Sequence, residues 1–447
     1  MSTKPPGPKG EPVFGNGRRY ADDPFAFLRA CAEAYGDVVR FDLGPMETYM
    51  LTRPADIERV LVSEAGKFAK PSFQADALGD LLGDGLLLSE GDRWREQRRL
   101  ANPAFDMGRL SGMADRMTGY AEATVADWTP GEVRDVQVDM TRVTLEIICD
   151  AMLGVELDPE RRRTIRESLE PLGERFEPDP LGFVVPDWVP TREKREYDRA
   201  LGTMEDLIGE IVAERRGTEG DPGAEGGPSD LLSILLRAQG RGEADDEAIR
   251  DEVMTILLAG HDTTALTLTY AWYLLSANQT AERRLHAEVD RVVDGGVPTL
   301  ADVREFDVVE RVLKEAMRLY PAVYAVFREP KVDVRLGGYR VPAGTSVMLP
   351  QWVVHRSADH WRNPDAFDID RWAPGRVSDR HRFAYFPFGG GPRHCIGKHL
   401  SLLEGQLILA TVAARYRLEY ARDEPFDLRG SLTMHPAEPM EMRVVER

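Results

Sequence analysis

The sequence predicts a mainly α-helical protein with a smaller β region, folded as one domain over residues 1–447. Two observations indicate helices: apolar residues recur at helical spacing through most of 107–215, and residues 253–277 form one long apolar stretch. A third observation indicates strands, because residues 331–349 alternate with period two around Gly-Gly and Pro-Ala-Gly turn signals.

The other elements are expected in the following order along the chain. Further helices are predicted over 23–36, 301–320 and 396–416, and early strands over 38–44 and 48–53. A proline-rich apolar connection is expected over 177–191, and irregular chain over 354–388. The acidic segment 216–230, rich in glycine and proline, is expected to be a flexible surface loop, because the helical pattern resumes directly after it.

The composition limits the partners and the compartment. The net charge is −19, with 76 acidic and 57 basic residues, which argues against nucleic acid as a general partner. Two explanations for the acidity stay open: a host rich in salt, or a surface kept acidic for solubility. Cys31, Cys149 and Cys395 are odd in number and far apart, as expected in a reducing cytoplasm.

Two segments bear on membrane insertion. The first residues contain no apolar run, so neither a signal peptide nor an anchor is expected there. Residues 253–277 are long enough to cross a bilayer, but His261 and Asp262 lie in the middle, where charge is costly in lipid. We therefore expect the central helix of a large soluble core, a cytoplasmic location and no transmembrane anchor.

The stretch "FPFGGGPRHCIGKHL" over 386–400 presents a single thiol, Cys395. The glycines at 389–391 allow positive φ and close backbone approach. Arg393 and the start of the following helix are expected to favour the thiolate form of Cys395.

Three uses of this thiolate are open from the local residues. A nucleophile needs a base, which His394 or His399 could supply. A zinc ligand needs companions, which His381, His394 and His399 could supply. An axial ligand of haem iron needs no other protein ligand on its own face, and the local residues favour this use.

Residues 388–397, "FGGGPRHCIG", match the haem-binding signature Phe-x-x-Gly-x-Arg-x-Cys-x-Gly at every fixed position, and the sequence thereby resembles the cytochrome P450 family. "AGHDTT" at 259–264 and "KEAMRLYP" at 314–321 match two further motifs of the family in the family's order. The resemblance spans essentially the whole chain. It implies the cytochrome P450 fold, in which a haem lies between a long central helix and the loop that carries the cysteine ligand.

The resemblance assigns residues to the haem, which is expected to be haem b, iron protoporphyrin IX. Cys395 is the expected metal ligand. The expected haem contacts are the propionate partners Trp94, Arg98, Arg328 and Arg393, the loop residues Phe388 and Gly389, and the central-helix residues Ala259 and Gly260.

On the central helix, the resemblance implies that Thr263 provides the hydroxyl at the oxygen-binding groove and that Asp262 is the acid in the proton route. Thr264 is expected to bond back to its own helix.

Glu315 and Arg318 lie three residues apart on one helix face, where a solvated surface pair is the usual outcome. The resemblance implies instead a buried structural network with Arg371 from the meander.

The implied activity is insertion of one oxygen atom from O2 into a C–H bond, with electrons from NAD(P)H. The chain contains no flavin or iron–sulfur module, so a separate ferredoxin or flavodoxin is expected, and the arginines at 93, 95, 98 and 99 could meet it. A peroxide-using haem-thiolate peroxygenase and a haem-thiolate isomerase or dehydratase are the alternatives.

The apolar character of "AVYAVF" predicts a lipophilic substrate: a fatty acid, terpenoid, steroid or carotenoid. The expected pocket residues are Val323, Ala325, Val326 and Met434.

Overall fold

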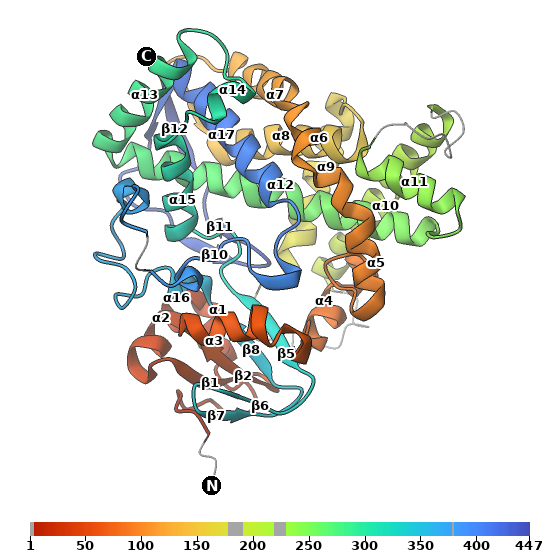
Figure 1. The fold of residues 1–447 in the computed structure, drawn as a ribbon, viewed down its shortest axis with the longest axis vertical. Coiled ribbons are helices and arrows are strands. Elements are labelled where there is room, and N and C mark those ends of the chain that lie inside the picture. The colour runs from red at the N-terminus through yellow and green to blue at the C-terminus, as the bar shows by residue number, and fades with distance from the viewer. Residues whose placement is uncertain (1–3, 178–190, 219–228, 378–379) are drawn as a thin grey trace.

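The computed structural model describes residues 4–177, 191–218, 229–377 and 380–447. Helices dominate, and most of the strands gather at the end of the molecule that holds the N-terminus (Figure 1). The predicted connection over 177–191 and most of the predicted loop over 216–230 lie outside the described residues, although helix α10 continues to Thr218.

The helices of the first half are α1 (Gly17–Asp22), α2 (Pro24–Tyr35), α3 (Pro54–Glu58), α4 (Ser72–Leu82), α5 (Gly91–Ala101), α6 (Met107–Ser111), α7 (Ala114–Ala126), α8 (Val136–Ile148) and α9 (Pro159–Glu174). Those of the second half are α10 (Arg192–Thr218), α11 (Leu231–Gly240), α12 (Asp246–Ser276), α13 (Gln279–Val293), α14 (Leu300–Val303), α15 (Val308–Leu319), α16 (Gln351–Val354) and α17 (Lys398–Arg415).

The strands form small sheets. The largest has the order β1-β2-β8-β5-β3, with β1 (Val38–Leu43) antiparallel to β2 (Met46–Leu51) and β2 parallel to β8 (Ser346–Leu349). The other strands are β3 (Phe68–Ala69), β4 (Val133–Asp135), β5 (Val326–Pro330), β6 (Val334–Leu336), β7 (Tyr339–Val341), β9 (Tyr416–Tyr420), β10 (Leu428–Gly430), β11 (Met434–Pro436) and β12 (Glu441–Glu446). The predicted β region over 331–349 is confirmed.

Local signals explain several element boundaries. Asp23 caps α2 by accepting from the backbone N–H groups of Phe25 and Ala26, and Pro24 stands at the first helical position. The helix predicted over 301–320 is two helices, α14 and α15, and the helix predicted from residue 396 begins at Lys398.

Helix α12 crosses the middle of the molecule (Figure 1) and is buried along most of its length. It begins at Asp246, earlier than the apolar stretch, because Asp245 caps it by accepting from the backbone N–H of Ala248. Helix α8 packs closely against it: a Cβ on Gly260 would lie 2.7 Å from Ile148 Cδ1. Among the described residues no helix is long and apolar enough to cross a membrane.

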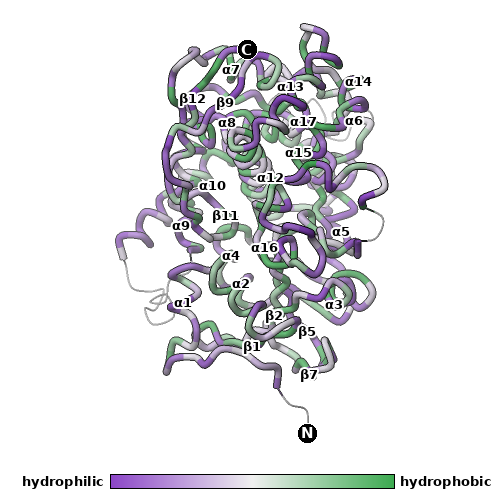
Figure 2. Tube along the Cα trace, turned by 90° about the vertical axis from the view of Figure 1, so that its left-hand side faces the viewer, coloured by the Kyte–Doolittle hydropathy of each residue, from purple (hydrophilic) through white to green (hydrophobic). Residues whose placement is uncertain are grey.

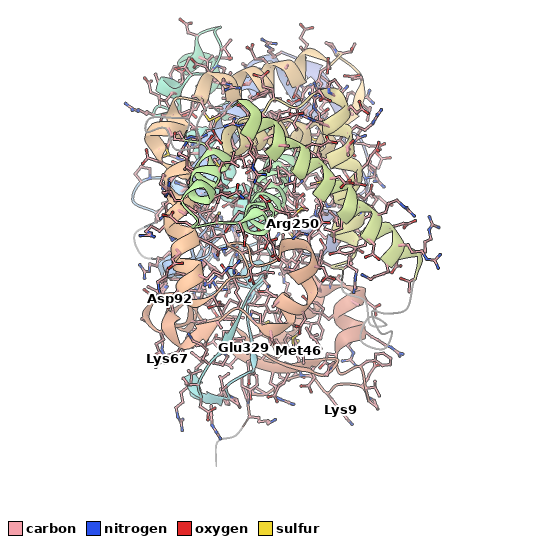
Figure 3. The ribbon with its side chains drawn as sticks, turned by 90° about the vertical axis from the view of Figure 1, so that its right-hand side faces the viewer. Lys9, Met46, Lys67, Asp92, Arg250 and Glu329 are labelled. Carbon is pink, nitrogen blue, oxygen red and sulfur yellow. The ribbon has the colours of Figure 1, made fainter. Side chains whose placement is uncertain are left out.

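Polar segments run along the outside of the molecule (Figure 2). Two charged residues tie elements around the α4–α5 side together (Figure 3). Glu329 of β5 accepts from the backbone N–H of Ser72, at the start of α4, and Arg250 of α12 donates to Glu205 of α10 and to the Asp80 carbonyl. These contacts hold α4 and α10 against the central helix.

Candidate active site

The loop before Cys395 has backbone that only glycine adopts easily. Gly389 and Gly391 have φ of 67° and 68°, in the left-handed region. A Cβ on Gly391 would lie 1.8 Å from the Leu61 carbonyl oxygen, and one on Gly390 would lie 2.6 Å from the Phe383 ring. At Gly389, by contrast, a Cβ would meet nothing within 4 Å. The loop is therefore pressed against the protein on one side and open at Gly389.

The Cys395 side chain is exposed, unlike Cys31 and Cys149, and its backbone N–H donates to the Phe388 carbonyl at 2.9 Å. Although the residue is exposed at the surface of the loop, the surrounding protein desolvates the sulfur and raises the pKa of the thiol, while the amides of Gly397 and Lys398 and the charge of Arg98 lower it. The expectation that the start of the following helix favours the thiolate agrees with the effect of these amides, and Arg98 is the cation with the largest effect, but desolvation of the sulfur outweighs them. A bound metal ion would reverse this balance, because a coordinated thiol is deprotonated.

Three predicted haem contacts meet beside this loop. The Arg393 guanidinium lies 4.5 Å from the centre of the Trp94 ring and pairs with Glu90 at 3.0 Å. Arg98 donates to the His394 carbonyl at 3.0 Å. The predicted contacts from α5 and from the loop are thus brought together at the start of α5.

Arg328 of β5 is buried, and its only hydrogen bond among the described residues goes to the neighbouring Phe327 carbonyl at 2.7 Å. Burial and the charge of Arg393 lower the pKa of Arg328 to about 10. Lys70 lies in the same place: burial, Arg328 and Arg393 lower the pKa of Lys70 well below its ordinary value. The sequence analysis missed Lys70, because no short motif surrounds it.

Lys70 and Arg328 have few acceptors among the described residues, since Arg328 donates only to the Phe327 carbonyl. Glu90 is the one carboxylate that acts on Lys70, Arg328 and Arg393 together, and no described residue accepts a hydrogen bond from the Lys70 ammonium. Buried cations without acceptors are unfavourable unless an anion joins them. The donor set therefore fits the two carboxylates of a haem.

The centre of α12 is also open to one side. Ala259 is exposed although most of the residues around it in α12 are buried, and Gly260 and Thr263 are half-buried. The Thr263 hydroxyl donates to the Ala259 carbonyl at 3.1 Å, whereas the Thr264 hydroxyl donates to Ser401 of α17 at 3.0 Å. The expectation that Thr264 bonds back to its own helix is wrong, because its hydroxyl donates to Ser401 of the neighbouring helix α17 instead.

Asp262 faces the turn between β10 and β11. The Thr433 hydroxyl donates to Asp262 Oδ2 at 2.7 Å, and His435 Nε2 lies 3.4 Å from the same oxygen. Burial raises the pKa of Asp262, but His435, His261 and the Thr433 hydroxyl outweigh burial and lower it to about 2. The sequence analysis missed Thr433 and His435, which lie about 170 residues from Asp262 in the chain and carry no recognisable motif.

Glu315, Arg318 and Arg371 are brought together away from solvent. The side chains of Glu315 and Arg318 are 0% exposed and joined at 2.8 Å, and Arg371 Nε donates to Glu315 at 3.1 Å. Trp372 Nε1 and the Asp368 backbone N–H also donate to Glu315. The remaining donors of Arg318 are satisfied by the carbonyls of His355, Pro364 and Ala366. The surface-pair alternative is therefore wrong.

The predicted pocket residues come from two neighbouring segments. Val323 and Val326 are half-buried, Ala325 and Met434 are buried, and Val326 begins β5. The Met434 backbone N–H donates to the Ala322 carbonyl at 2.8 Å, which fastens the β10–β11 turn to the segment before β5.

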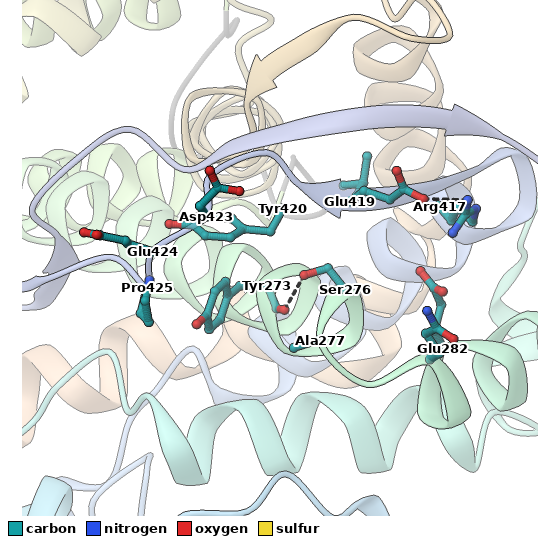
Figure 4. Close-up of a pocket in the computed structure, with 12 residues that line it drawn as sticks. Tyr273, Ser276, Ala277, Glu282, Arg417, Glu419, Tyr420, Asp423, Glu424 and Pro425 are labelled. Atoms are coloured by element: carbon teal, nitrogen blue, oxygen red, sulfur yellow. Dashed lines mark hydrogen bonds and ion pairs between the residues drawn. The ribbon is translucent and has the colours of Figure 1, made fainter.

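Other candidate sites are separate from this one. Among the described residues, no three His, Cys, Asp or Glu side chains are grouped to hold a metal ion, so the zinc alternative has no ligand set there. A surface pocket of ≈ 440 Å³ lies at the far end of α12, between Tyr273, Glu282 and Arg417 (Figure 4). None of the predicted site residues lines that pocket.

The comparisons with known proteins agree with this geometry. The family model "Cytochrome P450" matches residues 5–442. The chain therefore belongs to the cytochrome P450 family, and it is a haem-dependent monooxygenase.

Similar proteins include pentalenene oxygenase of Streptomyces avermitilis, which is 29% identical over 98% of this chain and 97% of the relative. Cyclooctatin synthase of Streptomyces melanosporofaciens is 36% identical over 92% of this chain and 89% of the relative. Cyclooctat-9-en-7-ol 5-monooxygenase of the same organism is 33% identical over 92% and 88%. The crystal structure of the cytochrome P450DA heme domain matches with a TM-score of 0.88 and 30% identity over 100% of this chain and 98% of that one.

Proposed function

We propose that this cytochrome P450 hydroxylates a terpenoid, using haem b held by Cys395 and electrons from a separate ferredoxin or flavodoxin in the cytoplasm. The balanced reaction is R–H + O2 + 2 e⁻ + 2 H⁺ → R–OH + H2O. The observation that carries the proposal is the exposed residue Cys395 together with the buried Arg328 and the half-buried Lys70, which have few acceptors among the described residues. The terpenoid part rests on the names of the relatives.

The chain's own residues divide the work. Cys395 would hold the iron, and Lys70, Arg98, Arg328 and Arg393 would hold the propionates. When bound, the haem supplies oxygen activation and electron transfer. The half-buried Val323 and Val326 offer apolar contacts that orient a lipophilic substrate and exclude water.

Protons would reach the site from the side of α12 rather than from the side of the Cys395 loop. Asp262 and Thr263 stand at the open centre of α12, and general acid–base groups must lie within hydrogen-bonding reach of the group they protonate. In the structure Thr263 bonds to Ala259 and Asp262 to Thr433, so proton delivery requires the Thr263 hydroxyl to leave its own helix.

The redox partner is proposed from charge. Arg93 and Arg95 are exposed on α5, where they pair with Asp84 and Asp92. Exposed pairs of this kind are weak, so an acidic partner can exchange with them.

The first test is the absorption spectrum of the reduced protein under carbon monoxide. Wild type should show the red-shifted Soret band of a thiolate ligand, and Cys395→Ser should lose it. Cys31→Ser is the matched control, because that thiol is buried away from the loop. Retention of the band by Cys395→Ser contradicts the ligand assignment.

The second test is product formed per NAD(P)H consumed, with pentalenene-type hydrocarbons as trial substrates. Thr263→Ala should still bind substrate but release peroxide instead of product. Asp262→Asn should slow oxygen consumption. Equal turnover with peroxide and no electron donor would favour the peroxygenase alternative, and turnover with neither would favour the isomerase or dehydratase.

A further inference from the structure

The acid of α12 is joined to a chain of polar side chains that the family motif does not include. Asp262 Oδ2 accepts from the Thr433 hydroxyl at 2.7 Å, and Thr433 Oγ1 lies 2.8 Å from His435 Nε2. His435 Nδ1 in turn lies 3.2 Å from Gln137 Nε2 of α8. Three elements, α12, the β10–β11 turn and α8, thus contribute to one line of hydrogen bonds.

The number of protons available on each side chain decides which group donates in each of these hydrogen bonds. A threonine hydroxyl has one proton, and here Thr433 donates it to Asp262. His435 Nε2 must therefore carry the proton of the second bond and donate it to Thr433 Oγ1. A proton added at His435 can thus move to Thr433 and displace the Thr433 proton onto Asp262.

Gln137 controls the other ring nitrogen. With its amide nitrogen toward Nδ1, Gln137 donates, and His435 is neutral with its proton on Nε2. Turned by 180°, the amide presents its oxygen and accepts from a protonated Nδ1, which allows a charged ring. One amide rotation therefore lets His435 take up a proton while its bond to Thr433 is kept.

We propose that Thr433 and His435 form the outer part of the proton route to Asp262, with Gln137 positioning the His435 ring. The inference rests on the proposed monooxygenase function, because that reaction consumes two protons for each oxygen atom inserted. Thr433 and His435 are positioning and relay residues, since they act on the reacting atoms only through Asp262.

The electrostatics of Asp262 explain why a relay is needed. His435, His261 and the Thr433 hydroxyl hold the pKa of Asp262 below its usual range, so Asp262 is ionised at pH 7. Asp262 cannot store the proton it delivers, so a neighbour must supply it during the reaction. Histidine is the side chain that changes charge between pH 5 and 8.

The charged groups around His435 are few. Asp262 lies on α12 together with the buried His261, whose pKa is lowered by burial and, to a smaller extent, by the charge of His435. Glu177 acts on His435 from the segment after α9 and is itself paired with Arg429 of β10 at 3.0 Å. The carboxylates that face His435 are thus Asp262 from α12 and Glu177 from the segment after α9.

The test compares Thr433→Val, which keeps the shape and removes the hydroxyl, with Thr433→Ser, which keeps the hydroxyl. Thr433→Val should lower product formed per NAD(P)H by about tenfold or more, and Thr433→Ser should restore most of it. His435→Gln keeps a donor of similar reach but cannot titrate, so its product ratio should be low and independent of pH. In wild type the ratio should fall as pH rises through the titration of His435. His360→Gln is the matched control and should behave as wild type.

A readout independent of turnover is the NMR spectrum of the His435 ring in the reduced, carbon monoxide-bound holoprotein. The neutral ring should carry its proton on Nε2, and Gln137→Glu should raise the titration midpoint of His435 by about one pH unit or more. The pH midpoint of the product ratio should move with it. All variants are compared at equal carbon monoxide band intensity and substrate-induced spin shift, so misfolding is recognised.

Two outcomes overturn the relay. One is a wild-type product ratio and pH profile in both Thr433→Val and His435→Gln while Thr263→Ala uncouples, which leaves the monooxygenase function standing. The other is a neutral His435 ring protonated on Nδ1. If wild type itself forms no hydroxylated product, the proposed function fails, and the tautomer still decides whether the relay geometry exists.

Discussion

Two groups of cations in this protein have opposite surroundings. Arg318 and Arg371 share Glu315, and backbone carbonyls take up their remaining donors. Arg328 and Lys70 have almost no acceptors among the described residues, and desolvation, followed by the charges of neighbouring arginines, lowers both pKa values.

The difference separates structural charges from ligand-binding charges. A buried ion whose donors are all satisfied by the protein stabilises one conformation and has nothing left to offer a ligand. A buried ion left without acceptors destabilises the empty protein and gains when an anion arrives. Counting acceptors, rather than counting arginines, therefore identifies the propionate side of the haem site.

The largest effect on stability is expected from breaking the buried network of Glu315, Arg318 and Arg371. Glu315→Ala leaves Arg318 and Arg371 buried without their carboxylate and should lower the free energy of unfolding by about 3–5 kcal/mol. Little soluble, haem-loaded protein is expected. The control is Glu310→Ala, which removes an exposed pair with Lys314 on the same helix and should cost under about 0.5 kcal/mol. A Glu315→Ala holoprotein with wild-type melting would contradict the structural role of Arg318 and Arg371.

Removing Arg328, one of the two cations with few acceptors, should weaken haem retention rather than the stability of the fold. Arg328→Met deletes a buried charge that lacks acceptors, so the haem-free protein should melt at the same or a higher temperature than wild type. Loss of charged hydrogen bonds to a propionate should weaken haem retention by about 10–100-fold, measured as transfer to apomyoglobin. Arg340→Met, at an exposed position paired with Asp333, should change neither quantity. Destabilised apoprotein with unchanged haem retention would place Arg328 in the structural group.

Glu404 is a buried carboxyl without a cationic partner among the described residues, and it tests whether a buried ionisable group without a partner lowers stability when it is charged. Burial raises the pKa of Glu404 in α17 to about 8, from an ordinary value near 4.5. Between these values the folded state holds a proton that the unfolded state releases, so stability falls as pH rises from about 4.5 to 8. Glu404→Gln should remove this fall, by up to about 1.4 kcal/mol for each unit of the shift.

The measurement for Glu404 is melting temperature against pH for wild type and Glu404→Gln. The two curves should converge near pH 4.5 and separate toward pH 8, with the variant higher. Glu441→Gln, at an exposed carboxyl, should follow wild type throughout. Parallel curves for wild type and Glu404→Gln would show that Glu404 is ionised in the folded protein.

The smallest effect concerns the surface as a whole. A net charge of −19 causes self-repulsion, which salt screens as the Debye length falls from about 10 Å at 0.1 M to about 3 Å at 1 M. Melting temperature should therefore rise by a few degrees with potassium chloride. A flat response would remove the salt-rich host as an explanation of the acidic composition.

The sequence by itself determined the class of fold, the central helix and the thiol. Apolar periodicity is local, so α12 could be located from its residues, and the motif around Cys395 lies within ten consecutive positions. The same holds for Glu315 and Arg318, which share one helical turn. These features can be predicted from the sequence because the residues concerned are neighbours in the chain.

Only the tertiary structure decided how each charged group is used. Lys70 reaches Arg328 and Arg393, and Thr433 and His435 reach Asp262, across long separations in sequence that leave no spacing pattern. The pKa of Cys395 depends on the balance of burial against two amides and two cations, which no local rule gives. Burial and acceptor count are properties of the folded surroundings, so the difference between a structural ion, a ligand-binding ion and a proton relay appears only after folding.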